Sequence, residues 1–242
     1  MPSLPPSAPE RWASDDVTAF IDAARVNEYA TFANLPAQMS RLIGIDRAFR
    51  KVIDAFNNSK DWFPGLFVLR AHSNYLGACR LTLSGQLPES YALLRSTLEN
   101  ALYGLYLSRN PASRETWLRR EDDTKSKQKV RNEFTIGALL KLATQIAPSE
   151  GKVAKTMYER AIAQGAHPNE LALMQTLKLG KQPAHLKFTV SYLQGDGLPL
   201  QLALKSTAQV GVCTLALFER VMPERYAILG INQDVASLQA GL

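Results

Sequence analysis

The sequence predicts an all-α protein, a bundle of about six to eight helices with a small β-hairpin near the C-terminal third. Through most of the chain the apolar residues recur at intervals of three and four, which is the period of an amphipathic helix. Proline, asparagine and glycine divide these runs into separate segments. Between residues 186 and 204 the period changes to two, which is typical of half-buried strands. We expect one helical domain over residues 11–242, in which residues 176–205 form an insertion that contains the hairpin.

The N-terminal part of the chain begins with a segment that is not expected to fold. Residues 1–10 combine four prolines with small polar residues, so they are predicted to form a mobile tail. A first helix follows the polar cap at Ser14–Asp16 and is expected to run to about Val26. A second begins at Pro36, which suits a first helical turn, and ends near Phe56.

Two further helices are predicted to form the centre of the bundle. The segment from about Leu66 to Ser84 is followed by Gly85, the residue type that most often follows a helix. The next segment, Pro88–Asn110, is apolar nearly all round, and a helix of that kind belongs in a core. Because the connection is short, we expect the two helices to pack antiparallel.

The middle of the chain is predicted to be helical but highly charged. A long helical stretch is expected over residues 112–146, with a break near Thr124. Its central part has Val130 as its only apolar anchor, so it is expected to be a solvated face or a projecting helix. A further helix is expected from Ser149 to about Gln164, where Gly165 stops it.

The C-terminal third contains the predicted hairpin. Residues 186–192 and 198–204 both alternate apolar with other residues, and the turn-forming stretch 194–197 separates them. We therefore expect these two segments to pair as strands. A helix that starts at Pro199 is the alternative. A last long helix is predicted to end at Val221.

The composition is that of a soluble globular protein, with 46% hydrophobic and 21% charged residues in a chain of 242. A net charge of +6 suits a nucleic acid or another anionic partner, but the charges are spread along the chain, which favours a solvated surface. Cys79 and Cys213 match no zinc or redox spacing and indicate free thiols in a reducing cytoplasm. We find no secretory signal and no uninterrupted apolar run long enough to predict a membrane span.

Two charged residues interrupt the predicted core helix. Arg95 and Glu99 are four residues apart and so lie on the same side of it. Since a buried charge is costly without a partner, we expect them to pair. One interpretation is a structural ion pair. The other is a polar pocket, in which the guanidinium binds an anionic group and the carboxylate serves as acid, base or ligand.

The preceding helix supplies three further candidate ligand-binding residues. His72 lies on its apolar face, and Arg70 and Arg80 lie on a neighbouring face. If the two helices pack antiparallel, His72 is expected to approach Glu99, which would tune its imidazole. A core histidine whose hydrogen bonds are satisfied is the alternative.

A second candidate region is the loop that contains His167 and Asn169, because functional side chains are often presented on loops. In this interpretation His167 is an acid or base and Asn169 contacts a ligand. Alternatively, Asn169 caps a short helix. The helical di-metal and metalloprotease signatures are absent, as are the nucleophile elbow, the phosphate-binding loop and the dinucleotide fingerprint. We expect no metal and no cofactor.

Arg160 and His167, with six residues between them, resemble the arginine–histidine motif of the HEPN class (higher eukaryote and prokaryote nucleotide-binding) and of abortive-infection proteins. The resemblance extends over residues 66–169 and implies a helical bundle. Many members of that class are metal-independent ribonucleases that dimerise to join two such motifs. The resemblance thus implies a homodimer that acts on RNA, in which Arg160 stabilises developing negative charge and His167 moves a proton.

These observations define three hypotheses for the function. The first is a helical protein that binds a small anionic ligand in a polar pocket, or that acts as a regulatory or assembly module. The second is the ribonuclease implied by the resemblance. The third is nucleic-acid binding through the basic surface around Lys125, Lys127, Lys129 and Arg131, where no aromatic residues are interleaved for stacking.

Overall fold

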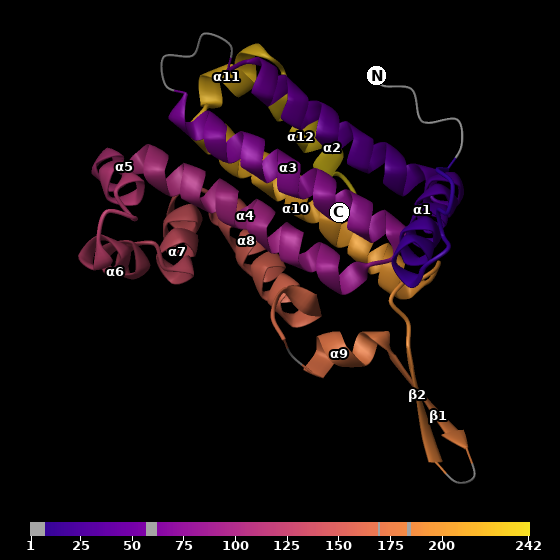
Figure 1. The fold of residues 1–242 in the computed structure, drawn as a ribbon. Helices are drawn as coiled ribbons and strands as arrows, with labels where there is room; N and C mark the ends of the chain where they lie inside the picture. The colour runs from indigo at the N-terminus through magenta and orange to yellow at the C-terminus, as the bar shows by residue number, and fades with distance from the viewer. Residues whose placement is uncertain (1–7, 57–61, 169, 183–184) are drawn as a thin grey trace.

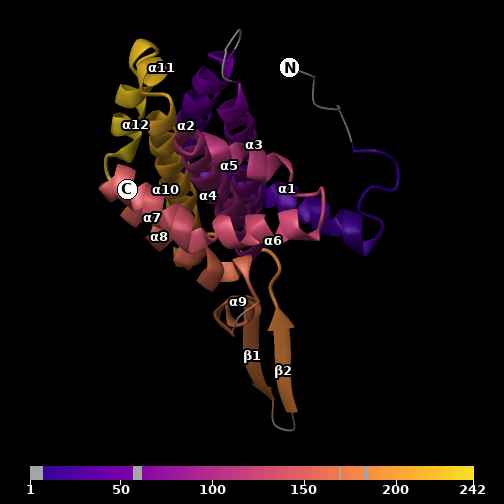
Figure 2. The same ribbon diagram turned by 90° about the vertical axis from the view of Figure 1, so that its left-hand side faces the viewer.

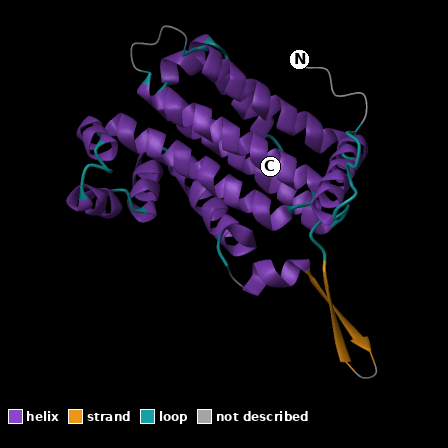
Figure 3. Cartoon of the chain, viewed as in Figure 1, coloured by secondary structure: helices purple, strands orange, loops and turns teal. Residues whose placement is uncertain are grey.

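The computed structural model describes residues 8–56, 62–168, 170–182 and 185–242. The predicted all-α class is confirmed (Figures 1 and 3). In the described ranges the helices run from α1 to α12, more than the six to eight expected. The elements are α1 (Asp16–Asn34), α2 (Pro36–Asp54), α3 (Phe63–Ser84), α4 (Leu87–Arg109), α5 (Pro111–Leu118), α6 (Thr124–Glu133), α7 (Ile136–Ile146), α8 (Pro148–Ala161), the π-helical segment η1 (Ile162–Ala166), α9 (Glu170–Thr176), β1 (Leu177–Gln182), β2 (His185–Val190), α10 (Leu198–Val221), α11 (Pro223–Ile228) and α12 (Ile231–Gln239). Residues 1–7 of the predicted tail lie outside the described residues.

The larger number of helices arises mainly in the charged middle of the chain. The stretch expected as one helix is divided into α5, α6 and α7, and the predicted break at Thr124 is where α6 begins. Asp123 caps α6 by accepting a hydrogen bond from the Ser126 amide, and Thr135 caps α7 by accepting one from the Ala138 amide. Each cap satisfies an amide that has no partner within its helix, so each favours a new helix start.

Helix α10 lies at the centre of the bundle, in contact with α2, α3, α4, α8 and α12 (Figure 1). Its length and composition would allow it to cross a membrane, but 78% of its most apolar window is buried inside the molecule. The other helices cover its apolar surface, as they do for a core helix of a soluble protein. Buried side chains from most of the helices join into one hydrophobic core.

Helices α3 and α4 form the predicted antiparallel pair. The chain leaves α3 through Gly85, whose φ of +85° is in the left-handed region that glycine adopts readily. The predicted core position of α4 is confirmed, because Leu94, Leu98 and Leu102 are at most 1% exposed. Leu107, on the opposite side of α4, is fully buried as well, and burial on several sides explains why the segment is apolar nearly all round.

The predicted pairing of residues 186–192 with 198–204 is wrong. In the structure β2 pairs antiparallel with β1, and Leu177 lies opposite Val190. Residues 198–204 form the first turns of α10, the alternative that proline favours, since the amide it lacks is not needed in a first helical turn. The helix buries Leu200 and Leu204 but leaves Leu202 half exposed, whereas a strand would place all three on one face.

The arm formed by residues 166–193, which includes α9, β1 and β2, extends away from the bundle (Figure 1). Both of its ends are attached to the turn between α3 and α4. At one end Gly165 packs so closely on Pro88 that a Cβ atom would lie 2.4 Å from the Pro88 carbonyl oxygen. At the other end the main-chain amide of Gln194 donates to the Gly85 carbonyl oxygen at 2.9 Å.

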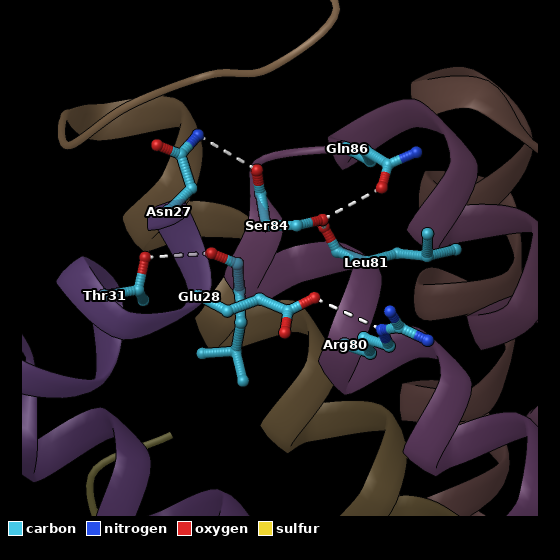
Figure 4. Close-up of polar contacts among 8 residues, drawn as sticks. Asn27, Glu28, Thr31, Arg80, Leu81, Ser84 and Gln86 are labelled. Carbon is cyan, nitrogen blue, oxygen red and sulfur yellow. Dashed lines mark hydrogen bonds and ion pairs between the residues drawn. The ribbon is translucent and has the colours of Figure 1, made fainter. Parts of the chain in front are cut away.

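Helix α1 projects sideways from the end of the bundle (Figure 2). It is attached to the C-terminal end of α3 by two hydrogen bonds, which Figure 4 shows. The Asn27 amide nitrogen donates to the Ser84 carbonyl oxygen at 3.1 Å, and the Thr31 hydroxyl donates to the Leu83 carbonyl oxygen at 2.9 Å. These bonds satisfy carbonyl groups that have no partner within α3.

Candidate functional site

Arg95 and Glu99 pair as predicted. Arg95 Nε donates to Glu99 Oε1 at 2.8 Å, and the Tyr158 hydroxyl on α8 donates to the same oxygen at 3.1 Å. The guanidinium lies over the Tyr158 ring, 5.2 Å from its centroid. Both charged side chains are 32% exposed, so the pair lies at the edge of the core and not within it.

The charges of this pair compensate each other. Burial opposes the charged form of Arg95, but the hydrogen bond and negative charge of Glu99 outweigh burial and raise the pKa of Arg95. The pKa of Tyr158 is also raised, first by burial and then by the charge of Glu99. The two opposite charges are paired with each other, which is the arrangement expected of a structural ion pair.

His72 does not approach Glu99, so that expectation is wrong. It is buried, and its Nε2 lies 2.6 Å from Asp46 Oδ1 on α2, while its ring stacks on Phe49 at a centroid distance of 5.2 Å. The other oxygen of Asp46 accepts a hydrogen bond from Arg50 Nε at 2.8 Å. Burial acts to raise the pKa of Asp46, but hydrogen bonds and charges from Arg50 and His72 lower it overall. This is the core histidine with satisfied hydrogen bonds that was the alternative.

Arg70 and Arg80 are exposed and do not join Arg95. Arg80 Nε donates to Glu28 Oε1 at 3.2 Å, which connects α3 to α1 (Figure 4). The expected pocket formed by Arg95, Glu99 and His72 is therefore not present among the described residues. Its members belong to separate contacts on α2, α3 and α4.

The structure brings a different set of polar groups together around Arg160, in the last turn of α8. Its Nη1 donates to Ser206 Oγ at 3.2 Å and to Gln209 Oε1 at 3.1 Å, both on α10. The Tyr91 hydroxyl on α4 points to the same serine, with its oxygen 3.5 Å from Ser206 Oγ. We call these four residues the Arg160 site. Helix α8 ends next to it, and the segment η1, which contains a kink at Gly165, follows directly.

The surroundings of the Arg160 guanidinium differ from those of the Arg95 guanidinium. Within the described part of the chain, no carboxylate forms an ion pair with Arg160, and its partners are a hydroxyl and an amide. The C-terminal end of α8 offsets this charge only in part. The charge acts on Tyr91: burial raises the pKa of that phenol, while the hydrogen bond to Ser206 and the positive charge of Arg160 act to lower it.

Beside the Arg160 site, a recess of about 110 Å³ opens between α8 and α10. Its lining includes Glu150 on α8 and Gln209 and Cys213 on α10, so Gln209 borders both the recess and the guanidinium. The carboxylate in the lining, Glu150, is already paired, because Arg220 Nη2 donates to its Oε1 at 3.0 Å. We call this hollow the α8–α10 recess. Arg160 is not part of its lining, and Gln209 connects the two.

The chemical capacity of the Arg160 site is that of binding. Its hydroxyl, amide and phenol groups are neutral at ordinary pH, and a guanidinium does not exchange protons in that range. A fixed cation with neutral hydrogen-bonding neighbours is suited to hold an anion. In the described ranges, no group of three or more histidine, cysteine, aspartate or glutamate side chains could hold a metal ion.

The remaining candidates that the structure describes lie on the surface. His167 is exposed, and its Nδ1 lies 3.1 Å from the Pro168 carbonyl oxygen. Asn169 lies outside the described residues. Of the basic candidates on α6, Lys127 pairs with Glu121 at 2.9 Å. No residue of α6 is buried, which fits the solvated or projecting helix expected there.

Ser206, Gln209 and Tyr91 were not predicted as site residues. A signal for two of them was present, because Ser206 and Gln209 are polar residues three apart and so lie on the same side of the helix. Asp46 was also missed, although its four-residue spacing to Arg50 predicts an ion pair on α2.

The chain was compared with protein families, curated proteins and solved structures. No protein-family model matches the chain, and no curated protein or solved structure has significant similarity to it. The resemblance to the HEPN class therefore stays a prediction.

Proposed function

We propose that this protein is a binding module for a small anionic ligand, a carboxylate or a phosphate, which it holds at the Arg160 site beside the α8–α10 recess. The observation that carries the proposal is the half-buried guanidinium of Arg160, whose partners are neutral. A charge in such a position is costly to retain without an anion, and an arriving anion would compensate it.

The hydrogen bonds of Arg160 support this role. Nη1 uses both of its protons on α10, which fixes the plane of the guanidinium. Nε and Nη2 make no hydrogen bond to any described residue and are not among the buried, unpartnered atoms. Those two groups form the edge of the guanidinium that binds a carboxylate or phosphate through two parallel hydrogen bonds.

Binding is better supported than cleavage of RNA. A ribonuclease would need Arg160 and His167 on one phosphate. The hydrogen bonds of Arg160 go to α10, while His167 is exposed beyond η1 with its Nδ1 near the carbonyl oxygen of Pro168. The free thiols of Cys79 and Cys213 fit a reducing compartment, so we include a cytoplasmic location in the proposal.

The test is calorimetric titration of the protein with inorganic phosphate, pyrophosphate and citrate, each against Arg160→Gln and Arg160→Lys. We expect at least one probe to bind the natural protein. Arg160→Gln should weaken it by roughly tenfold to hundredfold, the value of a charge-assisted hydrogen bond. Arg160→Lys should weaken it as well, because lysine keeps the charge but loses the paired donors.

The matched control is Arg131→Gln, which removes the same charge from the exposed helix α6. It should leave binding unchanged. Equal loss in both variants would show a general effect of net charge and would overturn the proposal, as would failure of all three probes to bind. Cleavage of labelled RNA in the presence of EDTA, abolished by His167→Ala, would support the ribonuclease instead.

A further inference from the structure

Helix α3 exposes a stripe of side chains that has the spacing of a coiled-coil seam. Trp62 just before the helix is 61% exposed, and Leu66, Leu69 and Leu76 are 44%, 51% and 40% exposed. Ser73 and Arg80 complete the set, and both are exposed. We call these six residues the α3 stripe. Their intervals alternate strictly between four and three residues, the pattern that keeps side chains facing a partner helix.

The stripe lies on the side of α3 that faces away from α4 and α10. Residues between its members, such as Val68, Ala71 and Tyr75, are fully buried in the core. Leucines are rarely exposed in a row of this length without a partner, because each would gain free energy from burial. The α3 stripe therefore indicates an interface.

The order of residues in the α3 stripe is compatible with a second copy of this chain as the partner. The intervals read the same in both directions, so a second α3 can pack antiparallel on the first with the two-fold axis at residue 71. We infer that the protein forms a homodimer through the α3 stripe, with α3 of each subunit antiparallel to α3 of the other. This inference does not depend on the Arg160 site.

The side chains are complementary in that register. Trp62 comes opposite Arg80 of the partner subunit, where a guanidinium over an indole ring is favourable. Leu66 comes opposite Leu76 of the partner subunit. Leu69 comes opposite Ser73 of the partner subunit, and the small serine leaves room for the leucine. A parallel pair would instead place Arg80 against Arg80 of the partner subunit, and like charges repel.

Helix α1 extends the surface beyond the α3 stripe. The stripe is about 28 Å long, and at a width of about 10 Å it buries on the order of 300 Å² per subunit, less than the roughly 800 Å² of a standard interface. On α1, Val17, Ile21 and Phe32 share one side with Glu28. The contact of Glu28 with Arg80 shows that this side faces the α3 stripe. All three apolar side chains are exposed, and they would enclose the N-terminal end of the partner's α3.

Sedimentation velocity of the full chain over a range of concentrations tests the inference. We expect a concentration-dependent dimer, and Leu69→Glu should weaken it at least about tenfold because it places a charge in the centre of the seam. Ile21→Glu should weaken it less. Leu118→Glu, at a leucine of α5 that is 55% exposed, is the matched control and should have no effect. A monomer at every concentration overturns the inference, as does a dimer that Leu69→Glu leaves intact or that Leu118→Glu weakens equally.

Cross-linking tests the orientation. In the antiparallel register, the double variant Leu69→Cys/Ser73→Cys should form a covalent dimer under mild oxidation, and Leu69→Cys alone should not. In a parallel pair Leu69→Cys alone would cross-link, which would overturn the proposed register. Burial raises the pKa of both natural thiols, Cys79 and Cys213, to about 12, which disfavours their reaction.

Discussion

Arg95 contacts α8 and Arg160 belongs to it, yet the two guanidinium groups are bound in opposite ways. Arg95 has a carboxylate at 2.8 Å and an aromatic ring beneath it. Arg160 has a hydroxyl and an amide. Glu99 neutralises the charge of Arg95 within the fold. The fold orients the guanidinium of Arg160 but does not neutralise its charge. The pair that is easily recognised in the sequence, Arg95 and Glu99, is therefore the one whose charges already compensate each other.

The difference also shows how an oriented cation can be kept in a folded protein. Ser206 and Gln209 hold one nitrogen of Arg160 and so restrict its rotation. They lower the energetic cost of burial through hydrogen bonds but add no opposite charge. Orientation and neutralisation are therefore separate properties, and substitutions can change one without the other.

The largest expected effect comes from Gly165→Ala, which should disturb the Arg160 site and leave the Arg95 pair intact. Gly165 has a φ of +149°, and its Cβ would lie 2.4 Å from the Pro88 carbonyl oxygen. The end of α8 must then shift, at a cost of roughly 2–4 kcal/mol in the free energy of unfolding. Urea denaturation measures this cost. Gly137→Ala on α7, where a Cβ meets no atom within 4 Å, is the control and should stabilise the protein slightly.

The next effect in size is that of Glu99→Gln, which leaves Arg95 without its carboxylate. Because both side chains are 32% exposed, the loss should be about 1 kcal/mol, well below the ~3–5 kcal/mol of a fully buried pair. A double-mutant cycle with Arg95→Gln measures the coupling energy. A coupling near zero would contradict the structural role assigned to the pair.

A smaller effect on stability is expected from Arg160→Gln. This change removes a charge that has no carboxylate partner, so the free energy of unfolding should change by less than about 0.5 kcal/mol. Thermal unfolding beside Glu99→Gln makes the comparison direct. If Arg160→Gln costs as much as Glu99→Gln, the contrast between the two arginines is wrong.

The smallest expected effects are pKa changes at the two tyrosines. Burial raises the pKa of Tyr158, and the charge of Glu99 raises it further, so Glu99→Gln should lower it. Burial raises the pKa of Tyr91 while Arg160 opposes the rise, so Arg160→Gln should raise it further. Nuclear magnetic resonance of ring-labelled tyrosine measures both. Shifts in the same direction would contradict the assignment of opposite charges.

The directions of these pKa shifts determine how the stability of the protein changes with pH. A phenol whose pKa is raised by folding stabilises the protein fully at pH values below about 10 and loses that contribution as the pH rises. The loss begins near the unfolded-state pKa in every variant, and it is larger where folding raises the pKa further. Relative to its stability at neutral pH, Arg160→Gln should therefore lose more stability in alkali, because the pKa of Tyr91 is higher still. Glu99→Gln should lose less, because the pKa of Tyr158 is lower.

Much of the fold could be predicted because its determinants are local. The Gly85 cap, the helix starts at proline and the antiparallel α3–α4 pair all follow from residues close in the chain. The strand pairing could not be predicted, because the leucines of residues 198–204 suit a strand and a helix equally. Only the contact of Leu200 and Leu204 with a core built from distant segments decides for the helix.

The contacts of the candidate site residues also divide into those that are local in the sequence and those that join distant segments. Arg95 and Glu99 are four residues apart on one helix, so their pairing is visible in the sequence. The partners of Arg160 are 46 and 49 residues away, on α10, so they depend on how α8 and α10 pack. His72 shows the same limit, since its partner Asp46 comes from α2 and not from the helix expected to face it.

The attachment of the arm at Gly165 and Gln194 has a consequence for the architecture. Both attachment points lie on the turn from Gly85 to Pro88, so the arm leaves and rejoins the bundle at one place. A segment with such adjacent ends behaves as a detachable appendage, because a short linker can close the gap at little entropic cost. We expect that replacing residues 167–192 with a short glycine–serine linker would leave the bundle folded.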